Sequence, residues 1–151
     1  MTSSNDRPLS PHLQIYRWQL TMIMSILHRI TGAALCVGTL MIAWWLVAAM
    51  LGEGPYNTAM NFAKSPLGLF MLFGWTFCLY YHLFNGIRHL IWDTVHLLKI
   101  ENAYRAGYVV LLFTAVFTVG TWICAYNDYS AERRIENFNA PSPDGPNGKG
   151  Y

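Results

Sequence analysis

Three long apolar runs, separated by shorter polar connections, dominate the pattern of this chain. No Asp, Glu, Lys or Arg occurs within residues 30–52, 65–87 or 106–127. Each run is close to the roughly 20 residues that cross a hydrocarbon core of about 30 Å as a helix. The pattern predicts an all-α membrane protein with a domain at 21–127 and three transmembrane helices, at about 25–51, 65–90 and 106–127.

The segments that flank these runs are polar. Residues 1–20 are expected to be extended and interfacial, because two prolines fall within four residues and aromatic rings flank a cation. The connection 56–64 is expected to be short and polar. Residues 128–151 are rich in Pro, Gly, Asn and charges of both signs. They are expected to form an exposed polar tail, poorly ordered unless a partner holds it.

The composition points to lipid as the solvent of this domain. The chain is 54% hydrophobic and only 12% charged, whereas a soluble domain carries about 25% charged residues. A formal net charge of +2, spread along the chain, gives no basic patch for nucleic acid. Three cysteines without CxxC spacing indicate neither a disulfide framework nor a zinc site.

Basic residues near the ends of the three runs predict the orientation. With three crossings, the N-terminus and the second connection share one side of the membrane. Six basic residues lie on that side and four on the other: Arg7, Arg17, Arg29, Arg88, Lys99 and Arg105 against Lys64, Arg133, Arg134 and Lys149. The excess predicts a cytoplasmic N-terminus. It also places the polar groups of residues 25–29 and 88–93 at the same membrane face.

A polar stripe lies at the end of the second run. His82, Asn85, Gly86 and His89 follow the i, i+3, i+4, i+7 spacing of one helix face. His82 is about 10.5 Å deeper than His89 along the helix. A histidine at this depth is either a structural residue bonded to a backbone carbonyl, or a cofactor ligand or proton relay.

His82 and His89 cannot both be axial ligands of one haem iron. Imidazole–metal bonds of about 2 Å place two trans ligand nitrogens about 4 Å apart, far less than the separation of residues seven apart on a helix. If His82 binds haem, the second ligand comes from another helix. Because no other histidine lies deep in a predicted span, that ligand would belong to a second subunit.

Several donors near the membrane surface could serve anionic or quinone ligands. Arg29, Arg88, His28 and His89 have the charge and the N–H groups to hold haem propionates, with anchoring to lipid headgroups as the alternative, above all for Arg88. Ser25 and Arg29 share a helix face and could donate hydrogen bonds to a quinone carbonyl. Their alternative roles are helix capping for Ser25 and contact with lipid phosphate for Arg29.

Three motifs in order resemble those of a known family. Residues 7–9 (RPL), 25–32 (SILHRITG) and 82–93 (HxxxGxRHxxxD) are similar to those of the cytochrome b (b556-type) subunits of succinate dehydrogenase, the larger membrane anchors of respiratory complex II. The resemblance covers residues 7 to about 126. It implies half of a heterodimeric anchor helix bundle that passes electrons from succinate to ubiquinone in the tricarboxylic acid cycle. The implied partners are a second small anchor, an iron–sulfur subunit and a flavoprotein.

The resemblance also implies roles for single residues. His82 matches the axial ligand of a haem b shared with the partner anchor. Ser25 and Arg29 match the ubiquinone-site pair, and Ile26 matches an apolar contact to the quinone ring. His28 and His89 match residues near the haem propionates. Asp93 ends the last motif and could help deliver protons to the quinone.

Three other functions compete with this one. The chain could be a haem-free structural anchor, a fumarate reductase anchor, or a small proton-conducting membrane protein that uses His82, His89 and Asp93 as a relay. By itself the chain is not expected to be catalytic. We expect a bacterial inner-membrane protein, with the mitochondrial inner membrane as the alternative location.

Overall fold

A computed structural model describes residues 16–96 and 99–140, and in these ranges it contains helices and no strands. The helices are α1 (Leu20–Leu51), α2 (Glu53–Lys64), α3 (Pro66–Asp93) and α4 (Ile100–Asn139). By length and composition α1, α3 and α4 are able to cross a membrane. The predicted all-α fold with three long apolar helices is therefore confirmed.

The sequence explains where the long helices begin and end. α1 ends at Leu51 and is followed by its C-cap residue Gly52, whose φ of 108° lies in the region that favours glycine. α3 begins where the Ser65 side chain accepts a hydrogen bond of 3.1 Å from the Gly68 backbone N–H. Pro66 follows in the first turn of α3. A backbone N–H at this position would have no acceptor within the helix, so proline costs no hydrogen bond there.

The connection between the first two spans is itself helical. Residues 56–64 were expected to form a short polar connection, yet they lie within the 12-residue helix α2. Glu53 in its first turn and Lys64 in its last turn both complement the helix dipole. Pro55 also falls in the first turn, so it does not interrupt the helix.

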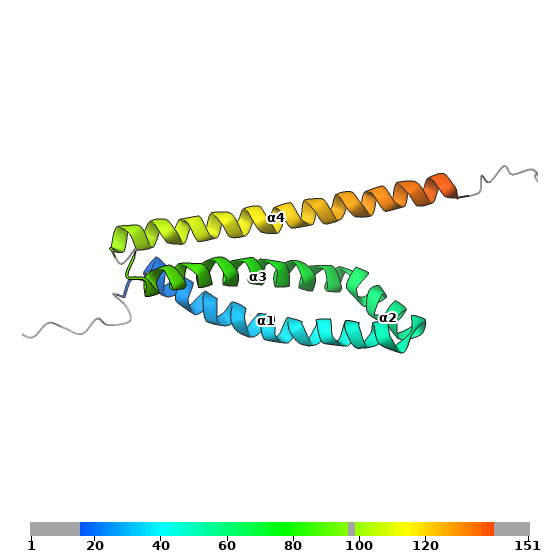
Figure 1. The fold of residues 1–151 in the computed structure, drawn as a ribbon, viewed down its shortest axis with the longest axis horizontal. Coiled ribbons are helices and arrows are strands. Elements are labelled where there is room, and N and C mark those ends of the chain that lie inside the picture. The colour runs from blue at the N-terminus through cyan, green and yellow to red at the C-terminus, as the bar shows by residue number, and fades with distance from the viewer. Residues whose placement is uncertain (1–15, 97–98, 141–151) are drawn as a thin grey trace, which may run out of the picture.

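The long helices run alternately up and down. α1 and α3 lie side by side and antiparallel, α2 closes one end between them, and α4 packs along α3 (Figure 1). Consequently the start of α1, the end of α3 and the start of α4 lie at the same end of the bundle (Figure 1). This arrangement confirms that the polar groups of residues 25–29 and 88–93 lie at one end.

A small core joins the three long helices near that end. Met24 of α1, Tyr81 of α3 and Val110 of α4 are buried together, and the Tyr81 hydroxyl donates a hydrogen bond of 2.9 Å to the Met24 carbonyl. Elsewhere most large apolar side chains are exposed, and the buried residues of α1 are Met24, Thr31 and Ala48 only. α1 therefore presents an extensive apolar surface to lipid or to another subunit.

α4 continues beyond the predicted end of the third span. Residues 128–139, expected to begin an irregular tail, are helical up to Asn139. This part of the tail has no proline, and Arg133 packs over the Tyr129 ring and donates to its hydroxyl at 2.9 Å, one turn away. Residues 141–151 and the predicted N-terminal segment up to residue 15 lie outside the described residues.

Removal of residues 130–151 should change the stability of the protein little. Of residues 128–140 all but Ser130 are exposed, so the described part of the removed segment contributes little packing against the other helices. We expect the melting temperature in detergent to change by no more than about 3 °C, the size of a surface effect. A much larger fall in a thermal scan would show that the tail docks against the bundle or a partner.

Candidate functional site

Three imidazole rings gather where α1 faces α3. His28 of α1 stacks on His82 of α3, with ring centroids 3.9 Å apart and planes within 9° of parallel. His89, two turns further along α3, has its ring centroid 5.3 Å from that of His28. The antiparallel packing of α1 and α3 thus brings together three of the residues selected from the sequence.

One nitrogen of His82 is held by the α1 backbone. Its Nδ1 lies 3.1 Å from the His28 carbonyl oxygen and 3.4 Å from Thr31 Oγ1. The Thr31 hydroxyl itself donates to the same carbonyl at 3.0 Å. Because a carbonyl only accepts hydrogen bonds, Nδ1 carries the ring proton and the lone pair of the neutral ring lies on Nε2. This is the arrangement that orients a histidine as a metal ligand.

Gly32 leaves the space on α1 against which the His82 ring packs. A Cβ at residue 32 would lie 3.0 Å from His82 Cε1, closer than ordinary contacts between carbon atoms allow. Thr31 is also part of this contact surface, with an exposed fraction of 6%. Sequence reasoning assigned no role to Thr31 or Gly32. Their position three and four residues after His28 was the signal that they share its helix face.

Arg88 lies apart from the histidine cluster. Its guanidinium donates to Asn85 Oδ1 at 3.3 Å and to the Ala103 carbonyl in α4 at 3.0 Å, and it lies over the Trp92 ring, 4.1 Å from the centroid. Its exposed fraction is 2%. The structure therefore does not bring Arg88 to His28 and His82.

Like Arg88, Asn85 does not join the histidine cluster. It was expected to share the stripe of His82 and His89, but its side chain is fully buried and accepts from Arg88. Helical spacing explains this: Arg88 is seven residues after the buried Tyr81, and Asn85 is four residues after it. Both residues belong to the edge of the helix that faces α4.

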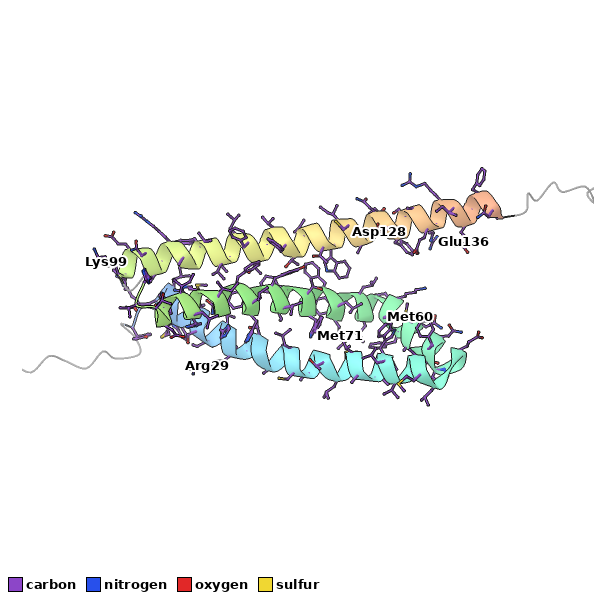
Figure 2. The ribbon with its side chains drawn as sticks, in the orientation of Figure 1. Arg29, Met60, Met71, Lys99, Asp128 and Glu136 are labelled. Atoms are coloured by element: carbon purple, nitrogen blue, oxygen red, sulfur yellow. The ribbon has the colours of Figure 1, made fainter. Side chains whose placement is uncertain are left out.

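Ser25, Ile26 and Arg29 lie on the open side of α1. Ile26 has an exposed fraction of 40%, Ser25 is half-buried and Arg29 is exposed. Arg29 lies on the side of α1 that faces away from α4 (Figure 2). α1 begins at Leu20 with Gln19 as its N-cap, so Ser25 does not cap the helix. Within residues 16–96 and 99–140, neither Ser25 nor Arg29 makes a side-chain hydrogen bond.

Asp93 is the last residue of α3 and is exposed. It lies at the end of the bundle where α1 begins, on the same helix as His82 and His89 (Figure 1). Along α3, His82 lies farthest from this end, His89 is two turns nearer to it and Asp93 is at the end.

The nitrogen atoms of the histidine cluster suit a metal-containing cofactor that takes one ligand from this chain. In the described part of the chain, no group of three or more His, Cys, Asp or Glu side chains is placed to enclose a metal ion. His82 offers one imidazole nitrogen. His28 Nδ1 is buried without a hydrogen-bond partner in the described residues, so it is available to an added polar group.

Known proteins share most of this sequence. The family model described as succinate dehydrogenase/fumarate reductase transmembrane subunit matches residues 3–121. The succinate dehydrogenase cytochrome b556 subunit of Paracoccus denitrificans is 44% identical over 118 residues, which cover 78% of this chain and 91% of that protein. The corresponding subunit of Rickettsia felis is 36% identical over 119 residues, or 79% of this chain and 93% of that protein.

A mitochondrial protein has the same percentage identity over its matched part. The mitochondrial succinate dehydrogenase cytochrome b560 subunit of Sus scrofa is 44% identical over 121 residues, which cover 77% of this chain and 70% of that protein. The family match includes α1, α2, α3 and the histidine cluster, and it ends at residue 121, within α4.

Proposed function

Because this chain belongs to the succinate dehydrogenase/fumarate reductase transmembrane subunit family, we propose that it is the cytochrome b membrane anchor of a succinate dehydrogenase. In this role it binds haem b through His82 and forms part of the site where ubiquinone is reduced. The observation that carries the proposal is the hydrogen bond of His82 Nδ1 to the His28 carbonyl, which leaves Nε2 as a ligand nitrogen.

The residues of the cluster fit a haem. His82 would provide one axial nitrogen, and the buried, unpartnered Nδ1 of His28 would provide a hydrogen bond to a propionate, with His89 beside it. Bound haem b supplies a one-electron carrier. Arg88 is not included, because its guanidinium is directed toward α4. A further ligand to the iron would come from the partner anchor, because the His28 ring stacks parallel on the same side chain, His82, and its free Nδ1 is assigned to a propionate.

The open side of α1 suits a quinone. Ser25 and Arg29 are one helical turn apart and have no partners within the described residues, so both can donate to a quinone carbonyl. These bonds strengthen as negative charge develops on that oxygen, so they favour reduction over simple binding. Ile26 offers the ring an apolar surface. Asp93, at the water-exposed end, can deliver the protons that convert ubiquinone to ubiquinol.

The surface of α1 suits a second anchor subunit. Of the 32 residues of this helix only three are buried, and most of its side chains are exposed. The proposed complex contains that anchor, an iron–sulfur subunit and a flavoprotein. The N-terminal end, with Ser25 and Asp93, faces the cytoplasm of a bacterium or the matrix of a mitochondrion, so that electrons arrive from the soluble subunits on that side.

Purification from membranes tests this function. We expect the chain to bring with it a flavoprotein, an iron–sulfur protein and a second small membrane protein, and the complex to reduce ubiquinone with succinate. A complex that reduces fumarate with a low-potential quinol faster than it oxidises succinate would identify a fumarate reductase anchor. A chain that purifies alone and conducts protons in vesicles would contradict both functions.

Gly32→Ala should weaken haem binding without unfolding the protein. The new Cβ lies 3.0 Å from His82 Cε1, so the ring must tilt away from α1 and its bond to the His28 carbonyl is distorted. We expect roughly tenfold weaker haem retention, typical of a disturbed support of a metal ligand. The measurement is the haem content per purified complex, together with the position of the reduced α-band.

Gly120→Ala is the matched control for this substitution. It makes the same change in α4, and its Cβ meets no atom within 4 Å. Its haem content should equal that of the wild type, with a slight gain in helix stability. Identical haem retention in Gly32→Ala and Gly120→Ala would show that the His82 ring does not depend on its contact with α1.

A further inference from the structure

We propose that Arg88 and Arg105 bind the headgroup of an anionic phospholipid in a cavity between α3 and α4. This site is separate from the histidine cluster and from Ser25 and Arg29, and it depends neither on haem nor on quinone. Three features of the structure lead to it: the cavity itself, a buried cation without a counter-charge, and a change along the cavity from cationic to apolar walls.

The cavity has a volume of about 460 Å³ and lies along the contact between α3 and α4. Arg88 of α3 lines one wall of the cavity, and Asn102 and Arg105, from the first two turns of α4, line another. These are the polar groups of the lining. The remaining walls are formed by apolar side chains, among them Phe84, Val109 and Phe113.

Arg88 is a buried cation whose contacts are all neutral. In residues 16–96 and 99–140 its guanidinium contacts the Asn85 amide oxygen, the Ala103 carbonyl, the Met24 sulfur and the Trp92 ring. Its Nε is buried without a hydrogen-bond partner. A buried charge that is not paired is strongly unfavourable, so this position favours an anion that occupies the adjacent cavity.

The start of α4 adds positive potential at the same place. α4 begins at Ile100 after the N-cap residue Lys99, whose side chain makes no capping hydrogen bond in the described part of the chain. The N-terminal end of a helix favours negative charge. Together with Arg88 and the exposed Arg105, it makes this end of the cavity suitable for a phosphate group, whose oxygens match the forked donors of arginine.

The cavity becomes apolar with depth. Phe84 lies one turn, about 6 Å, deeper along α3 than Arg88, and Phe113 lies about 12 Å deeper along α4 than Arg105. The cationic end is the end of the bundle where α1 begins and α3 ends (Figure 1). A ligand that fits has an anionic head at the membrane surface and a hydrocarbon chain below it, which is the chemistry of an anionic phospholipid.

Lipid titration followed by native mass spectrometry tests this site in the purified complex. The probes are phosphatidylglycerol and phosphatidylcholine. Arg105→Gln removes a surface cation from the cavity, and we expect about fivefold weaker binding of the first phosphatidylglycerol, with phosphatidylcholine unaffected. Val109→Trp fills the apolar part and should weaken both lipids. Arg88→Gln should have a larger effect than Arg105→Gln where the complex still assembles.

Arg134→Gln is the matched control, because it removes an exposed arginine from the far end of α4, where its Nε donates to the Ser130 carbonyl at 3.3 Å. It should bind phosphatidylglycerol like the wild type. Equal phosphatidylglycerol affinity in the wild type, Arg105→Gln and Val109→Trp would overturn the proposal. So would a structure of the complex in which a carboxylate of another subunit occupies the cavity beside Arg88.

Discussion

His82→Ala should remove the haem from the complex. The substitution deletes the imidazole whose Nδ1 is bonded to the α1 backbone and whose Nε2 is left for the iron. His89 is two turns further along α3, and the stacked His28 ring has, within the described residues, no hydrogen bond on Nδ1 that would orient it as a ligand. We expect the α-band of a reduced-minus-oxidised spectrum to fall to less than about a tenth of its wild-type height, since loss of an axial ligand costs more than the 10–100-fold of an outer-shell change.

His96→Ala is the control for this experiment. His96 is exposed, and its Nδ1 lies 2.7 Å from the Thr94 carbonyl oxygen, outside the cluster. The spectrum of His96→Ala should be that of the wild type. An unchanged spectrum in His82→Ala would show that His82 is a structural histidine, whose bond to the His28 carbonyl only joins α3 to α1.

Ser25→Ala and Arg29→Gln should each lower succinate–ubiquinone reductase activity by about 10²-fold. Each removes a donor that acts on charge developing at the quinone oxygen, and loss of such a donor costs about that much in kcat. Oxidation of succinate by an artificial acceptor that takes electrons upstream of the quinone should remain at the wild-type rate. The ratio of the two activities is the measurement.

Lys64→Gln is the matched control for Arg29→Gln. Lys64 is an exposed cation in the last turn of α2, at the opposite end of the bundle. Its loss should leave both activities unchanged. If Ser25→Ala and Arg29→Gln lowered both activities equally, the two residues would act in assembly and not in quinone reduction.

The three long helices could be predicted from sequence because an uncharged run of this length has one stable arrangement in lipid, a helix that satisfies its own backbone groups. α2 was missed because its polar composition resembles a connection, and its helical character depends on the placement of Glu53, Pro55 and Lys64. The helical extension to Asn139 was missed for a similar reason. Its prolines and glycines begin only after Ala140, so the composition of the whole tail concealed a helical first part.

Positions along α3 were easier to predict than the neighbour that each side chain of the candidate site faces. Spacing gives the separations of His82, His89 and Asp93 along α3, because the rise per residue of a helix is fixed. It did not show which neighbour Arg88 faces, since that depends on where α4 packs. A bond of His82 to a backbone carbonyl was one of the alternatives, but spacing did not show that the carbonyl is that of His28, because a backbone acceptor has no signature in the sequence.

The most direct test of the haem assignment is a pyridine haemochrome measurement on the purified wild-type complex, with the amount of this chain determined in the same sample. One haem b shared between this chain and a partner anchor predicts a ratio of about one haem per chain, falling to near zero in His82→Ala. A complex that reduces ubiquinone with succinate at full rate and contains no haem would contradict it.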